Sequence, residues 1–137
     1  MFPQNHALKM VIADSSPIVR TGIKRLLAEA PEIRVVEECV DDKCVIAAMG
    51  DWRPDFVLMD FRLGDGTAVD VLQQCTALRP RPVCIVYTAD TDPDTRAICY
   101  AAGADAFYDK RDHLAPLIKM LRKFSARLLM GQAMAVR

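Results

Sequence analysis

Five short apolar runs recur along the chain, each bounded by polar or turn-forming residues. Runs of this kind fit β-strands that are buried on both faces. Between and after them, apolar residues recur every three or four positions, which is typical of amphipathic helices. The pattern predicts strands over residues 8–13, 34–38, 56–60, 83–88 and 106–108, and helices over residues 18–28, 44–49, 68–78, 95–102 and 117–129.

Individual residues support these boundaries. Pro17 suits the first turn of a helix, and Gly103 is expected to end the fourth predicted helix. The first predicted helix should bury one face and expose the other. Its apolar face is predicted from Ile18, Ile23, Leu26 and Leu27, and its basic face from Arg20, Lys24 and Arg25.

Strict alternation of strand and helix predicts a parallel sheet with helices on both faces, connected by right-handed crossovers. Five such units fit a flavodoxin-like α/β domain whose five-stranded parallel sheet has the order 2-1-3-4-5. A chain of 137 residues also matches one ordinary domain. We expect an N-terminal extension over residues 1–7, the domain over residues 8–129, and a frayed C-terminal tail over residues 130–137.

Charge and hydropathy narrow the class of protein. The 18 basic and 18 acidic residues balance to a net charge of zero, whereas binding to nucleic-acid phosphates requires clustered Lys and Arg. The first residues lack the features of a signal peptide, and no apolar stretch reaches membrane-spanning length. We therefore expect a cytoplasmic protein that binds other proteins rather than nucleic acid or a membrane.

The cysteines and histidines indicate no metal or redox centre. The five cysteines show no C-x-x-C spacing and fall mostly in apolar segments, so we expect them to behave as small hydrophobic side chains. The two histidines are isolated and are expected at the surface. These residues are Cys39, Cys44, Cys75, Cys84 and Cys99, together with His6 and His113.

Polar side chains follow or end four of the predicted strands. In an open parallel sheet, ligands bind outside the carboxyl ends of the strands, so these side chains should share one rim. A carboxylate nucleophile with a second acid, a hydroxyl and an ammonium beside it suits a phosphoryl group carried on aspartate. The four residues are Asp14, Asp60, Thr88 and Lys110.

Each of the four residues also has an ordinary structural role open to it. Asp14 is suited to capping the first helix, and Asp60 to forming a turn with residues 64–66. Thr88 is a normal strand residue, and Lys110 a normal solvated lysine. Their joint occurrence at four strand ends favours a functional site over these separate roles.

Four segments resemble the signature segments of the receiver domains of two-component response regulators. They are IADSSPIVRTGIKRLL, PDFVLMDFRLGDGTAVDVL, VCIVYTA and AAGADAFYDK, and the resemblance covers residues 8–129. It implies a stand-alone phosphoprotein of a phosphorelay, in which Asp60 accepts a phosphoryl group from a histidine kinase or phosphotransfer protein. The output partner, a further protein, is unknown. No enzyme activity is implied beyond self-phosphorylation from small donors and autodephosphorylation.

The same resemblance implies a role for each site residue. Asp14, Asp60 and the main-chain carbonyl of Arg62 would hold Mg²⁺, Thr88 and Lys110 would bind the phosphoryl oxygens, Ala89 would leave access to the site, and Thr88 with Phe107 would form the switch.

Two residues depart from the family pattern. Ser15 stands where the family normally has a second metal-binding acid. We therefore expect Mg²⁺ to bind about tenfold or more weakly than it would with that acid, a difference of about 1.4 kcal/mol. Arg111 follows the lysine where proline with a cis peptide is common, and a cis bond to Arg111 would cost about 2.5–4 kcal/mol. These departures leave a second hypothesis open: a degenerate receiver that acts as a phosphorylation-independent interaction module.

Two other classes of protein with a similar architecture, a phosphatase and a flavin carrier, fit less well. A dehalogenase-type phosphatase would need an aspartate at the position of Arg62, and a flavin carrier would need glycines in residues 14–17.

The last predicted helix suggests a surface for association. Its basic outer face is either an ordinary solvated surface or, alternatively, a site for an acidic partner or for a homodimer through the fourth helix, fifth strand and fifth helix. That face is predicted from Lys119, Arg122, Lys123, Arg127 and Arg137, beside an apolar stripe of Leu117, Met120, Leu121, Phe124 and Leu128.

Overall fold

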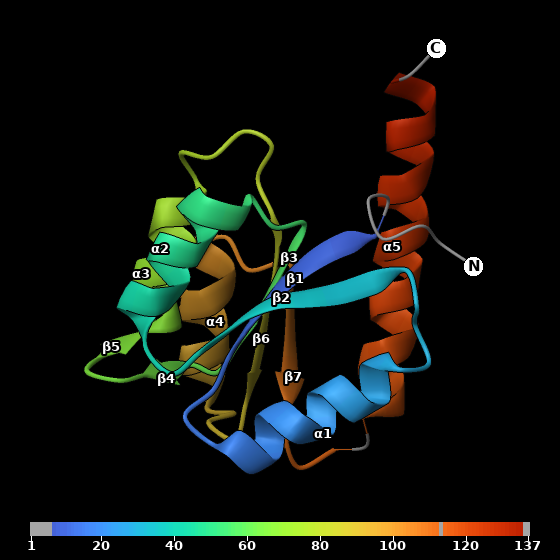
Figure 1. The fold of residues 1–137 in the computed structure, drawn as a ribbon. Helices are drawn as coiled ribbons and strands as arrows, with labels where there is room; N and C mark the ends of the chain where they lie inside the picture. The colour runs from blue at the N-terminus through green and yellow to red at the C-terminus, as the bar shows by residue number, and fades with distance from the viewer. Residues whose placement is uncertain (1–6, 113, 136–137) are drawn as a thin grey trace.

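The five apolar runs form the five strands of one parallel sheet (Figure 1). Its strand order is β2-β1-β3-β6-β7. This is the predicted order 2-1-3-4-5, since β4 and β5 form a separate two-stranded sheet, so that β6 and β7 are its fourth and fifth strands. The computed structural model describes residues 7–112 and 114–135. Its elements are β1 (Leu8–Ala13), α1 (Pro17–Leu27), β2 (Ile33–Cys39), α2 (Asp42–Trp52), β3 (Phe56–Met59), β4 (Arg62–Leu63), β5 (Gly66–Thr67), α3 (Ala68–Cys75), β6 (Val83–Thr88), α4 (Pro93–Ala102), β7 (Ala106–Asp109) and α5 (Ala115–Ala135).

Helices cover both faces of the sheet. Figure 1 shows α2, α3 and α4 on one face and α1 and α5 on the other, and each group packs on its own apolar cluster. Successive side chains of β1 point to opposite faces, so Val11 joins one cluster while Met10 and Ile12 join the other. Burial on both faces explains why the central strands read as continuous apolar runs.

The helix boundaries follow the local chemistry. Ser16 caps α1 by accepting a hydrogen bond from the main-chain N–H of Val19 at 3.3 Å, and Pro17 lies in the first turn. Gly103 ends α4 with a φ of 116°, a conformation that glycine adopts without a Cβ clash. The predictions for Pro17 and Gly103 are therefore confirmed.

The predicted apolar face of α1 is wrong at one position. Ile23 and Leu27 are buried, whereas Ile18 is 83% exposed. Ile18 and Ile23 are five residues apart, which at about 100° per residue places them about 140° apart around the helix. Arg20, predicted to point away, instead forms a hydrogen bond with Glu38 of β2 at 3.1 Å.

Helix α5 and a short hairpin also differ from the predictions. Helix α5 continues to Ala135 rather than ending at residue 129, because residues 130–135 include several good helix formers. The β4–β5 hairpin was not predicted, because each strand has only two residues. Within residues 7–112 and 114–135, no helix has the length and apolar character needed to cross a membrane.

The cysteines divide into two groups. Cys75, Cys84 and Cys99 are free, buried thiols, as expected of small hydrophobic side chains. Cys39 and Cys44 instead form a disulfide, which corrects the expectation that they are ordinary hydrophobic residues. The turn from β2 into α2 brings their Cα atoms to 5.5 Å, a proximity that the spacing alone does not reveal. The expectations for His6 and His113 lie outside the described residues.

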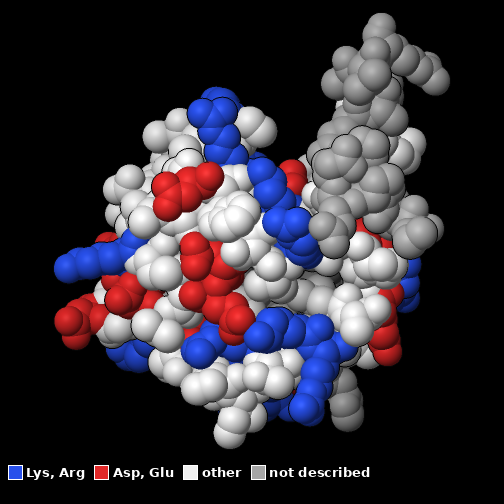
Figure 2. All heavy atoms as spheres, viewed as in Figure 1, with Lys and Arg blue, Asp and Glu red and all other residues white. Residues whose placement is uncertain are grey.

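The apolar side chains of α5 pack into the hydrophobic core. Leu117 and Leu121 are buried, and Met120, Phe124 and Leu128 pack against the same cluster, so the predicted apolar stripe contacts the sheet. On the face seen in Figure 2, acidic and basic side chains lie among one another, in agreement with the balanced composition.

Candidate functional site

The carboxyl ends of four parallel strands place the predicted polar residues on one rim of the sheet. Asp14 follows β1, Asp60 follows β3, Thr88 ends β6, and Lys110 follows β7. Nζ of Lys110 donates a hydrogen bond to Oδ2 of Asp60 at 2.7 Å and forms an ion pair with Oδ2 of Asp14. Three of the four side chains therefore meet directly.

Lys110 is the centre of this cluster. Its side chain is 17% exposed. Burial acts to lower the pKa of its ammonium, but hydrogen bonds and charge from Asp14 and Asp60 outweigh burial and raise that pKa above its ordinary value of 10.5. The ammonium is therefore charged at neutral pH. Two carboxylates against one ammonium leave one negative charge uncompensated, which favours a further cation.

Asp14 is held rigidly beneath the rim. It is 3% exposed, and its Oδ1 accepts a hydrogen bond from the main-chain N–H of Ser16 at 2.9 Å. Arg20 donates to the main-chain carbonyl of Asp14 at 2.6 Å. Oδ2 of Asp14 contacts Lys110 but accepts no well-directed hydrogen bond from the described residues. Because Ser16 is the N-cap of α1, capping is not the role of Asp14.

Asp60 is more accessible than Asp14. Its side chain is 18% exposed against 4% for Asp14. Oδ1 accepts a hydrogen bond from the main-chain N–H of Phe61 at 2.7 Å, while Oδ2 faces Lys110. The Asp60 main-chain N–H donates to the carbonyl of Ala13 at 2.9 Å, which fixes the end of β3 against β1. Asp60 is thus the carboxylate of the pair that a reactant can reach.

Thr88 lies beside this contact but faces another partner. It is 2% exposed, its Oγ1 accepts from the main-chain N–H of Asp90 at 3.2 Å, and its carbonyl accepts from the N–H of Lys110 at 2.9 Å. Ala89, the next residue, is exposed and leaves the rim open. The hydroxyl would have to turn from Asp90 to contact a group on Asp60.

Phe107 is buried below the rim, in the cluster on the α2–α4 face of the sheet. The Arg96 guanidinium of α4 lies 5.8 Å from its ring centroid and 5.5 Å from that of Tyr100. Arg96 was not predicted as part of the site, because an exposed helical arginine carries no signal of its own in the sequence.

Arg111 links the loop after β7 to the loop between β6 and α4. Its guanidinium pairs with Asp109 at 2.8 Å and donates to Oγ1 of Thr91 at 2.8 Å. The hydrogen bond with Arg111 lowers the pKa of the Asp109 carboxyl. Among the described residues the cis peptide bond is Arg79–Pro80, so the Lys110–Arg111 bond is trans. The loop accommodates Arg111 without the cis bond common in the resembled family.

The oxygen donors at the rim fit a divalent cation only loosely. The carboxylates of Asp14 and Asp60 lie there. The exposed Ser15 directly follows Asp14 in the chain, and the exposed Arg62 lies two residues after Asp60. In the described part of the chain, no three acidic, histidine or cysteine side chains gather as a metal cluster. The buried Oδ2 of Asp14 nevertheless has bonding capacity left for a cation. This donor set suits a hydrated Mg²⁺ ion better than a fully enclosed metal.

Comparison with known proteins identifies the family. The family model of the response regulator receiver domain matches residues 10–122. The DNA-binding transcriptional activator DevR/DosR of Mycobacterium tuberculosis is 28% identical over 103 residues, which cover 75% of this chain and 48% of that protein. The chain spans about half the length of the curated relatives it matches first.

Solved structures share the fold. A CheY-like response regulator receiver domain protein from Methanospirillum hungatei superposes with a TM-score of 0.79 at 19% identity, covering 92% of this chain and 98% of that one. The isolated receiver domain of RcsB from Salmonella enterica serovar Typhimurium, solved with the phosphomimetic BeF3−, gives 0.77 at 23% identity, covering 85% and 86%. With the family model matching most of its length, the chain belongs to the response regulator receiver domain family.

Proposed function

We propose that this receiver accepts a phosphoryl group on Asp60 from a histidine kinase or phosphotransfer protein and signals through protein contacts. The observation that carries the proposal is the contact of Lys110 with both Asp14 and Asp60 at the rim. It combines a reachable carboxylate with an ammonium that is charged at neutral pH, and both are needed to take up a phosphoryl dianion.

The chemistry follows from these groups. An oxygen of Asp60 attacks the phosphorus of a phosphohistidine, the P–O bond forms as the P–N bond breaks, and the imidazole leaves with a proton from water. The ammonium of Lys110 then pairs with a phosphoryl oxygen in place of the Asp60 carboxylate. Attack by water on the acyl phosphate releases inorganic phosphate and restores Asp60, which ends the signal.

Mg²⁺ is part of this proposal. Asp14, Asp60 and the main-chain carbonyl of Arg62 would hold it, with Ser15 contributing at most a neutral hydroxyl. A bound Mg²⁺ ion neutralises charge on the phosphoryl oxygens during transfer. Because Ser15 replaces a carboxylate, we expect weak binding and a reaction that needs a higher Mg²⁺ concentration to reach its full rate.

Thr88 and Phe107 would transmit the conformational change from Asp60 to the surface that contacts the output protein. If the Thr88 hydroxyl turns from Asp90 to a phosphoryl oxygen, it leaves space that the Phe107 ring can enter, and the α4–β7–α5 face changes. Ile98 and Tyr100 of α4 are 50% and 42% exposed, so apolar surface is available there for an output protein or a second copy.

Beryllofluoride, which mimics a phosphoryl group, tests the proposal by NMR. With Mg²⁺, we expect amide shifts at Asp60 that extend to Phe107 and α4, and none in Asp60→Asn. The matched control is Asp65→Asn, an exposed acid in the turn between β4 and β5, which should behave as wild type. Shifts confined to the loops around Asp14 and Asp60 would contradict the switch. Unchanged spectra would contradict the phosphoacceptor.

A degenerate interaction module is the second candidate. It is favoured by the exposed, uncharged Ser15 and by the lack of a three-residue metal cluster among the described residues. On this candidate, wild type and Asp60→Asn bind the output partner equally and beryllofluoride has no effect. The retained contact among Asp14, Asp60 and Lys110 favours phosphorylation.

A further inference from the structure

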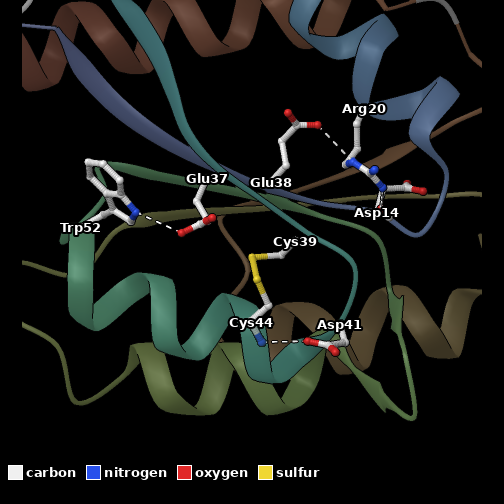
Figure 3. The surroundings of a disulfide bond; sticks show 8 residues. All are labelled: Asp14, Arg20, Glu37, Glu38, Cys39, Asp41, Cys44 and Trp52. Carbon is white, nitrogen blue, oxygen red and sulfur yellow. Dashed lines mark hydrogen bonds and ion pairs between the residues drawn. A yellow bond between two sulfur atoms is a disulfide. The ribbon is translucent and has the colours of Figure 1, made fainter.

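The turn between β2 and α2 is closed by a covalent bond. Cys39, the last residue of β2, forms a disulfide with Cys44 in the first turn of α2, with the Cα atoms 5.5 Å apart (Figure 3). Both ends of the bond are set by secondary structure, because Asp41 caps α2 by accepting from the Cys44 N–H at 2.8 Å. The ends of β2 and α2 therefore place the two sulfur atoms within bonding distance of each other.

We propose that Cys39 and Cys44 are a reversible redox pair, whose disulfide holds the β2–α2 turn against the acidic site and whose reduction releases it. The effect on phosphorylation rests on the function proposed for Asp60. The thiol chemistry and the movement of the turn do not depend on that function.

The two sulfur positions differ in a way that suits such a pair. Cys39 is 1% exposed, whereas Cys44 is partly exposed at the start of α2, so an oxidant reaches Cys44 first. Cys44 is therefore the attacking residue and Cys39 the resolving one. Cys99 is less reactive, because burial raises the pKa of its thiol to about 11.

The redox reactions balance with a peroxide and a dithiol. The Cys44 thiolate attacks one peroxide oxygen, giving a sulfenic acid and releasing hydroxide. The Cys39 thiol then attacks that sulfur, the S–S bond forms, and water leaves, so two thiols and hydrogen peroxide give a disulfide and two water molecules. A dithiol reverses the change by exchange, becoming a disulfide itself as Cys39 and Cys44 regain their protons.

The turn touches the segment that carries Asp14. The carbonyl of Cys39 accepts a hydrogen bond from the main-chain N–H of Asp14 at 3.0 Å. One residue earlier, Glu38 pairs with Arg20 at 3.1 Å, and Arg20 in turn donates to the Asp14 carbonyl (Figure 3). The end of β2 thus contacts the Asp14 main chain directly at its N–H and, through Arg20 of α1, at its carbonyl.

The turn also touches the segment that follows Asp60. Asp41, inside the disulfide ring, packs so closely on Gly64 of the β4–β5 connection that a Cβ there would lie 2.8 Å from the Asp41 Cβ. Gly64 has a φ of 63°, so both conformation and space restrict this position. A change in the turn therefore reaches both sides of the acidic site.

The experiment compares oxidised and reduced protein. Wild type, Cys39→Ala, Cys44→Ala and the control Cys99→Ala are treated with hydrogen peroxide or dithiothreitol. Accessible thiols are then mapped by alkylation and peptide mass. Wild type and Cys99→Ala should lose alkylation at Cys44 on oxidation and regain it on reduction. Alkylation of Cys44 that peroxide does not change would overturn the redox pair.

Two further readouts test the coupling. Reduction of wild type should shift the amide resonances of Asp14 and Gly64, and should slow acetyl phosphate labelling about fivefold or more. Both single variants should label at the reduced rate whether or not dithiothreitol is present. Unshifted amides with equal labelling rates would overturn the coupling. Suppose that neither the oxidised nor the reduced protein is labelled, while the thiols still oxidise and reduce reversibly and the Asp14 and Gly64 amides still shift. That result would support the redox pair and contradict the function proposed for Asp60.

Discussion

Nζ of Lys110 lies 2.7 Å from Oδ2 of Asp60, although the two residues are 50 positions apart in the chain. The same ammonium pairs with the buried Asp14. One lysine thus separates two carboxylates that would otherwise repel each other, and it stands where an incoming phosphoryl group needs positive charge.

Replacing Lys110 tests this dual role. We expect Lys110→Met to lower the free energy of unfolding by about 1–3 kcal/mol, because it leaves two carboxylates without their partner. The pKa of Lys110 is raised, so its stabilising contribution is complete below its ordinary value of 10.5 and is lost as the pH rises through the higher folded value. Urea unfolding of both proteins at pH 7 and pH 11 checks this. An equal difference at both pH values would contradict the assigned pairing.

Much of the site could be predicted because parallel strands end on one rim. Asp14, Asp60 and Lys110 each follow an apolar run long enough to be recognised as a buried strand. Topology then brings the residues together without any knowledge of side-chain contacts. The residue types at this rim indicate a phosphoryl group carried on an aspartate, and the resemblance to receiver domains adds the individual roles.

The rest depends on contacts that a one-dimensional pattern does not contain. The Cys39–Cys44 disulfide arises from the angle at which β2 turns into α2. The Arg111 bridge to Thr91 joins two loops 20 residues apart. Ile18 is apolar yet exposed, because it belongs to no buried face of α1. Single residues of this kind follow tertiary packing rather than periodicity.

Ser15→Asp should restore a metal-binding acid. We expect Mg²⁺ to bind about tenfold more tightly, or about 1.4 kcal/mol, because a carboxylate adds charge and a hard oxygen ligand. Without metal, the third carboxylate should destabilise the fold by up to about 1 kcal/mol. Isothermal titration calorimetry with Mg²⁺ measures the first effect, and urea unfolding the second. Ser16→Asp is the control, since aspartate is an equally good helix N-cap. Equal affinities for all three proteins would place residue 15 outside the metal site.

The Glu32–Arg122 pair should contribute to stability. Glu32 is 5% exposed, its Oε1 pairs with Arg122 at 3.1 Å, and its Oε2 makes no hydrogen bond to the described residues. Arg122→Met should lower the free energy of unfolding by about 1–2 kcal/mol, because a buried carboxylate loses its partner while the exposed half of Arg122 limits the loss. Lys123→Met, on the exposed face, should change little. Adding Glu32→Gln to Arg122→Met should recover part of the loss. If the double variant is no more stable than Arg122→Met, the unpaired charge of Glu32 is not the cause of the loss.

Reduction of the Cys39–Cys44 disulfide should destabilise the domain. The bond closes a ring of residues 39–44, and loop-closure entropy predicts a loss of about 2 kcal/mol in the free energy of unfolding. Thermal or urea unfolding with and without dithiothreitol measures this loss. Cys39→Ala should not respond to the reductant. If dithiothreitol destabilises Cys39→Ala as much as wild type, the loss of stability comes from another residue.

Phosphorylation of Asp60 is the central claim, and its most direct measurement is acetyl phosphate labelling followed by borohydride trapping and peptide mass mapping. In excess Mg²⁺, we predict one phosphoryl group per chain, located on Asp60, absent in Asp60→Asn and strongly reduced in Lys110→Met. Removal of Mg²⁺ with a chelator should abolish the label. A folded wild-type protein that remains unlabelled in saturating Mg²⁺, or one labelled at another residue, would contradict the account.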